Sequence, residues 1–120
     1  MNKNQLHSGW LCEAKLDFEE KQPIWKLEKN KTSKLLEIWN SLKTTLEPTK
    51  TKSAYIGYQG TYLKSSDNTE WHILNNTVTR LNNNTIETRF DKNRFFEKTI
   101  LKSAPSGTLP DALCSLLFGI

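Results

Sequence analysis

EWHILNNTVTRLNNNTIETRF, residues 70–90, contains the pattern from which the fold class follows. Apolar and polar residues alternate in it, as they do in strands that bury one face. Asparagines interrupt the alternation at 75–76 and at 82–84, and asparagine suits tight turns because it tolerates positive φ. The stretch therefore predicts three antiparallel strands, over residues 70–74, 77–81 and 85–90.

The two turns set the pairing of these strands. If Asn75-Asn76 form a two-residue turn, Ile73 lies opposite Val78, and Trp71 lies opposite Arg80 on the same face. Three consecutive asparagines permit several lengths for the second turn. The register of the last strand therefore stays open.

A hairpin, a helix and one more strand are predicted upstream. Apolar and charged residues alternate over 10–18, and the run 24–28 is short enough to pair back on them. Leucines spaced three and four apart around Trp39 predict a helix over 33–46 that ends before Pro48, with Trp39 in the core. Residues 54–64 then begin a four-strand meander.

Two helices are predicted downstream. Asp91 can cap a helix that the sequence Pro105-Ser106-Gly107 closes. Residues 110–118 suit a short terminal helix. The fold class that follows is α+β, with an antiparallel sheet of about six strands packed against one main helix and one or two C-terminal helices. We expect one globular domain over residues 1–120, with residues 1–8 mobile.

Composition narrows the class of protein. The chain has 120 residues, of which 36% are apolar and 25% charged, as in an ordinary soluble domain. The longest apolar run, 113–120, is too short to cross a bilayer, and the first residues lack a secretory signal. Cys12 and Cys114 show no metal-ligand spacing. We therefore expect a cytoplasmic protein with no disulfide, no metal, no cofactor and no membrane partner.

The most unusual local sequence is YIGYQGTY, residues 55–62. Glycines inside a strand mark a bulge, a bend or a close approach. By simple alternation Tyr58, Gly60, Tyr62 and Lys64 share one face, which could stack on a nucleic-acid base. We favour the alternative that the tyrosines pack over glycines on a curved sheet. With Trp71, which could stack on Arg80 at an exposed face, the candidate ligand or partner face comprises Tyr58, Gly60, Tyr62, Lys64, Trp71 and Arg80.

The sequence contains few residues that indicate a catalytic site. His7 and His72 are the two histidines, and no nucleophile, base and orienting group can be read together. The leading hypothesis is a non-catalytic protein that binds a protein partner, or itself, through a sheet face or edge. The alternative is a single-stranded nucleic-acid-binding domain that uses the aromatic and basic sheet face, in a chain with a net charge of +4. An enzyme whose site is not legible from the sequence is the third hypothesis.

Overall fold

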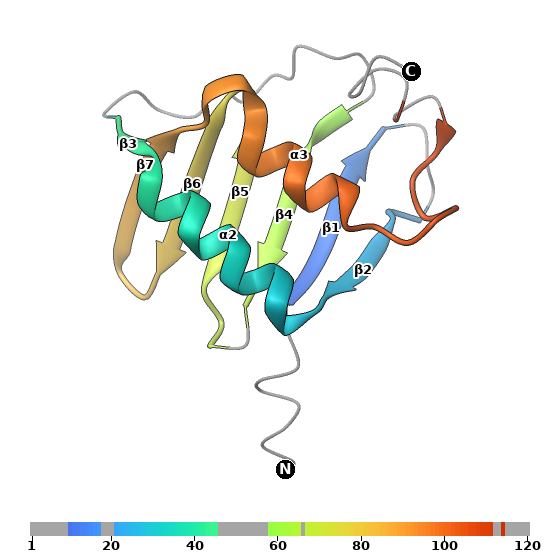
Figure 1. Ribbon diagram of the computed structural model, residues 1–120, viewed down its shortest axis with the longest axis horizontal. Coiled ribbons are helices and arrows are strands. Elements are labelled where there is room, and N and C mark those ends of the chain that lie inside the picture. The colour runs from blue at the N-terminus through green and yellow to red at the C-terminus, as the bar shows by residue number, and fades with distance from the viewer. Residues whose placement is uncertain (1–9, 18–20, 46–57, 66, 112–113, 115–120) are drawn as a thin grey trace.

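A computed structural model describes residues 10–17, 21–45, 58–65, 67–111 and 114. Across these residues a single antiparallel sheet runs in the order β2-β1-β4-β5-β6-β7-β3. Its strands are β1 (Trp10–Leu16), β2 (Ile24–Leu27), β3 (Lys43–Thr44), β4 (Tyr58–Lys64), β5 (Glu70–Leu74), β6 (Thr77–Asn82) and β7 (Thr85–Phe90). The helices are α2 (Lys29–Ser41) and α3 (Phe95–Lys102), the latter preceded by the 3-10 turn η1 (Lys92–Arg94). Both helices cross the same face of the sheet (Figure 1).

The predicted α+β class and antiparallel sheet are confirmed, while the strand count and helix bounds need correction. Seven strands stand in the described part of the chain instead of about six, because β3 pairs with β7 after α2. The main helix begins at Lys29 and ends at Ser41, not over 33–46. It ends early because Leu42 is extended and the chain turns into β3.

The predicted meander register is confirmed. Ile73 pairs with Val78 and Trp71 pairs with Arg80 around the Asn75-Asn76 turn, where both asparagines have positive φ. The second turn, left open by the sequence, is now fixed: Asn82 pairs with Thr85, so residues 83–84 alone make the turn.

Some predictions fall outside the described residues. These are the expected mobility of residues 1–8, the end of the first predicted strand at Phe18, the start of the third predicted strand at 54–57, and most of the terminal helix at 110–118, of which Asp111 and Cys114 are described as helical.

The core lies between the sheet and the two helices. Trp39 is buried, as predicted, and meets Trp71 edge to face with ring centroids 5.2 Å apart. Trp71 also stacks on Trp10 at 5.5 Å and on Phe96 at 6.0 Å. The interpretation of Trp71 as a surface residue is therefore wrong, because α2 and α3 cover the face on which it lies and leave it 2% exposed.

A bulge in β4 decides which way its two tyrosines point. Gly60 has φ of +113°, and the pairing between β1 and β4 shifts between Ala14 and Leu16. One inserted residue reverses the alternation of side chains in a strand. Tyr58 therefore turns toward the helices while Tyr62 lies on the opposite face, so the expectation that they share a face is wrong.

Candidate interaction face

The six candidate residues do not form one surface. Tyr58, Trp71 and Arg80 lie on the side of the sheet that the helices cover, and Gly60 is buried at the bulge. Tyr62 and Lys64 lie on the other side, where Tyr62 is half-buried and Lys64 is exposed. The sequence missed this division because alternation alone gives no sign of a bulge's exact position.

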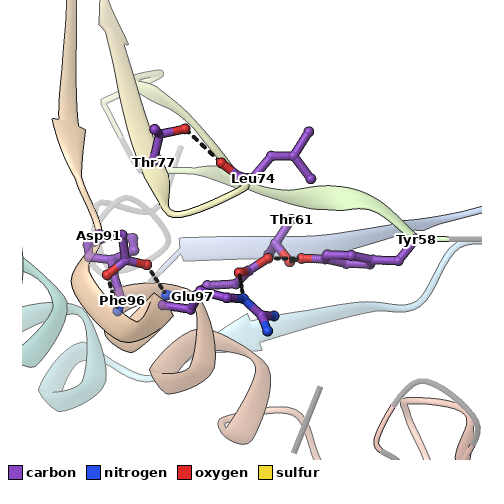
Figure 2. Close-up of polar contacts among 8 residues, drawn as sticks. Tyr58, Thr61, Leu74, Thr77, Asp91, Phe96 and Glu97 are labelled. Atoms are coloured by element: carbon purple, nitrogen blue, oxygen red, sulfur yellow. Dashed lines mark hydrogen bonds and ion pairs between the residues drawn. The ribbon is translucent and has the colours of Figure 1, made fainter. Parts of the chain in front are cut away.

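Tyr58 is fixed in a buried polar network. Its hydroxyl contacts the Thr61 hydroxyl at 2.6 Å and donates to the Glu97 carboxylate, which also accepts from Arg94 Nε at 2.7 Å (Figure 2). Burial and the neighbouring Glu97 raise the pKa of Tyr58 well above its usual value. The phenol therefore stays a proton donor that ties β4 to α3.

Asp91 anchors the start of α3. Its two carboxylate oxygens accept the backbone N–H groups of Phe96 at 2.8 Å and Glu97 at 3.0 Å (Figure 2). These are among the N–H groups that a helix leaves without an internal partner. Burial nevertheless raises the pKa of Asp91 to about 6. The cap was predicted, although it bonds to residues five and six positions later.

Arg80 is also engaged inside the molecule. Its Nη2 lies 3.2 Å from Glu87, and its guanidinium lies 5.1 Å from the centroid of the Trp39 ring. Arg89 bonds the same Glu87 and donates to the Trp39 carbonyl at 2.7 Å. The guanidinium groups of this cluster hold α2 on the sheet, because they contact the Trp39 ring and its carbonyl group.

The side of the sheet opposite α2 and α3 is termed the open face, because no helix of the described segments crosses it. The strand registers arrange its side chains in rows. The first, the Lys64 row, reads Lys26, Leu11, Lys64, Glu70, Leu81 and Ile86. The second, the Tyr62 row, reads Ile24, Glu13, Tyr62, His72, Thr79 and Thr88.

An open groove of about 470 Å³ runs over β1, β4 and β5 on this face. Tyr62 and His72 meet edge to face in it, with ring centroids 4.6 Å apart. Lys15 Nζ lies 5.5 Å from the centroid of the Tyr62 ring and 3.6 Å from Glu13. The groove is lined by Leu11, Glu13, Lys15, Ile24, Tyr62, Leu63, Lys64, Glu70 and His72.

His72 is the histidine that lines the groove. Burial lowers the pKa of His72 below its usual value, although the neighbouring Glu70 opposes this. No hydrogen bond from another described side chain orients its ring. Within the same described ranges, no three His, Cys, Asp or Glu side chains are placed to hold a metal ion. No helix there is long and apolar enough to cross a membrane.

Large apolar side chains are exposed at both ends of the open face. Leu11 and Ile24 are 47% and 55% exposed at the β2 end, and Ile86 and Phe90 are 70% and 46% exposed on β7. Sequence reasoning left these residues out of the candidate face. Their position could have been predicted from the alternation of side chains, since each of them is next to a residue that faces the helices.

No protein-family model, curated protein or solved structure matches this chain at a significant level. The open face is therefore interpreted from the chemistry of its own side chains.

Proposed function

We propose that this chain is a non-catalytic binding protein that holds a protein partner against its open face. The observation that carries the proposal is the set of large apolar side chains exposed on that face between charged ones. Exposed apolar surface rimmed by polar groups is typical of protein interaction sites, and here it forms two patches, on β1–β2 and on β7, that flank the charged and aromatic centre of the face. Tyrosine at the centre of such a face is also enriched in protein interfaces.

Single-stranded nucleic acid is a weaker candidate for this face. Three of the residues that would stack or bind phosphate, Tyr58, Trp71 and Arg80, are engaged on the other side of the sheet. Lys15 lies over the Tyr62 ring, where a base would have to stack. Glu13 and Glu70 also line the groove and repel phosphates.

Catalysis is likewise not the best account of the groove. His72 has two glutamates near it, which is the composition that an acid–base site would use. A general base needs an orienting partner and a place from which water is excluded. His72 has no orienting hydrogen bond among the described residues, and the groove opens broadly to solvent.

The proposal places the binding in a reducing compartment such as the cytoplasm. Cys12 and Cys114 are both free thiols, and Cys12 is fully buried. Burial also raises the pKa of the Cys12 thiol, so it stays protonated and unreactive. Thiol titration of the unfolded, non-reduced protein would show two free thiols per chain if this is right.

Site-specific photocrosslinking tests the face directly. A benzophenone amino acid replaces Ile24 in one variant and Ile86 in another, both exposed positions on the open face. Leu36, which is exposed on α2, gives the matched control on the opposite side of the molecule. After irradiation in cells that express the chain, we expect discrete protein adducts from positions 24 and 86 but not from position 36.

Two results would contradict this function. One is the absence of any adduct from the open face, and the other is an identical set from position 36. Titration with a single-stranded oligonucleotide tests the alternative function. Micromolar binding that is lost in a well-folded Tyr62→Ala variant would favour nucleic-acid binding.

A further inference from the structure

The four central residues of the Lys64 row are self-complementary about the line between β4 and β5, whereas Lys26 and Ile86 at its two ends are not. Lys64 and Glu70 pair across that line, with Leu11 beside Lys64 and Leu81 beside Glu70. From the middle outward, the row therefore has a base and an acid, and then a leucine on each side. Lys64 and Glu70 make no ion pair with each other within one copy of the chain, and both side chains are exposed.

The Tyr62 row repeats this symmetry with aromatic rings. Tyr62 and His72 pair across the same line and touch each other. The next residues outward are Glu13 on one side and Thr79 on the other. Thr79 is nearly buried and its hydroxyl already contacts the Thr88 hydroxyl at 3.0 Å, so the symmetry of this row rests on the aromatic pair.

A two-fold axis along this line, parallel to the strands, would stack two copies face to face. Because the axis exchanges β4 with β5, Lys64 of one copy meets Glu70 of the other, and the reciprocal pair forms as well. Tyr62 then meets His72, and Leu11 meets Leu81. Such isologous contacts are the rule in two-fold dimers, and sheets that stack in this way keep their strands aligned to within about 30°.

We propose that the partner of the open face is a second copy of this chain, bound about that two-fold axis. This inference rests on the proposed function and names its partner. Charge balance supports it, because Glu13 and Glu70 match Lys15 and Lys64 in the groove. A strongly basic or acidic partner would find no net opposite charge there.

The sheet edge is a poorer contact for a second copy. At one edge β2 has four residues, and the exposed Lys26 lies in the middle of it. Short strands and lysine are the features by which proteins discourage pairing at an edge. The other edge strand, β3, has two residues.

The dimer should be weak. The six strands from β2 to β7 span about 24 Å, since neighbouring strands lie about 4.8 Å apart. The Lys64 row and the Tyr62 row, which cross this span, then give less than the roughly 800 Å² per partner of a standard interface. We expect dissociation in the micromolar range, so measurements should run from about 1 µM to about 1 mM.

Sedimentation equilibrium with charge reversal tests the dimer. Lys64→Glu would place two glutamates opposite each other in both symmetric contacts, and Glu70→Lys would do the same with lysines. Each single variant should weaken dimerisation about tenfold or more. An equimolar mixture of the two variants should recover a heterodimer, because each altered residue then meets its opposite. The double variant should dimerise as the parent does.

Matched controls come from α2. Lys34→Glu and Glu37→Lys reverse exposed charges on the helix side and should leave the dimer unchanged. A parent protein that stays monomeric up to about 1 mM overturns the inference. A dimer that resists both open-face reversals, or singles that do not recover on mixing, overturns it too. A monomer that still gives open-face adducts in cells would retain the proposed function and assign it a different partner.

Discussion

One sheet presents two different faces in this protein. Under α2 and α3, four aromatic rings pack together and nearly every polar group has a partner, as in the Tyr58, Glu97 and Arg94 network. On the open face the charges are exposed or form one long ion pair, and apolar side chains reach solvent. The same strands supply both faces. A strand's alternation therefore separates two sets of residues without saying which set becomes the core.

The largest contrast between the faces should come from deleting large side chains. Trp39→Ala should lower the free energy of unfolding by about 3 to 5 kcal/mol, because a buried ring leaves a cavity. Ile86→Ala on the open face should change it by about 0.5 kcal/mol or less. Denaturant melts measure both. Equal losses would mean that the open face is a second core.

The second-largest loss of stability is expected at the Gly60 bulge, which places Tyr58 and Tyr62 on opposite faces. Gly60→Ala should cost about 2 to 3 kcal/mol, because φ is strained for any side chain and a Cβ would lie 3.0 Å from the Ile73 carbonyl oxygen. Gly107→Ala is the matched control, since Gly107 also has positive φ but nothing within 4 Å of its Cβ position. It should cost about 1 kcal/mol. Thermal or denaturant unfolding measures the loss of stability in both variants. Equal losses would show that the short distance to the Ile73 carbonyl oxygen does not contribute.

Removing the hydroxyl of Tyr58 or of Tyr62 should have different effects on stability, because the two side chains lie on opposite faces of the sheet. Tyr58→Phe takes a donor from the buried Glu97 carboxylate and should cost about 1 to 2 kcal/mol. Tyr62→Phe should be nearly neutral, because its ring contacts with His72 and Lys15 survive. Similar denaturation midpoints for the two variants would contradict the assignment of Tyr58 and Tyr62 to opposite faces.

The smallest expected effect is the pH dependence of stability that comes from Asp91, which is buried on the helix side of the sheet. Asp91 has a pKa of about 6 in the folded protein against 3.8 for an exposed aspartate, so the folded state binds its proton more tightly. Stability from this group is therefore lost as pH rises, by about 1 kcal/mol between pH 5 and 7.

Asp91→Asn provides the comparison for that titration. The variant keeps one acceptor for the α3 backbone but cannot ionise, so its stability should vary less over the same pH window. Urea melts of both proteins at pH 5, 6 and 7 measure the difference. Parallel pH dependences would show that Asp91 is not the titrating group.

The local elements and much of their pairing can be predicted from the amino-acid sequence. Asparagine turns fixed the Trp71 and Arg80 register, leucine spacing located α2 around Trp39, and Asp91 marked the start of α3. These features depend on neighbours a few residues apart, so a linear pattern contains them. The candidate site was less predictable: of the six residues chosen, Tyr62 and Lys64 have side chains on the open face.

The other features of the fold follow from how distant elements pack together. The packing of α2 and α3 chose which side of the sheet is covered, and so buried Trp71. The bulge at Gly60 moved Tyr58 from the face of Tyr62 to the face of Glu97. Pairing of β3 with β7 ended α2 early and added the seventh strand. Each outcome depends on contacts between residues far apart in the chain, whose free energies outweigh the local preferences that a sequence pattern records.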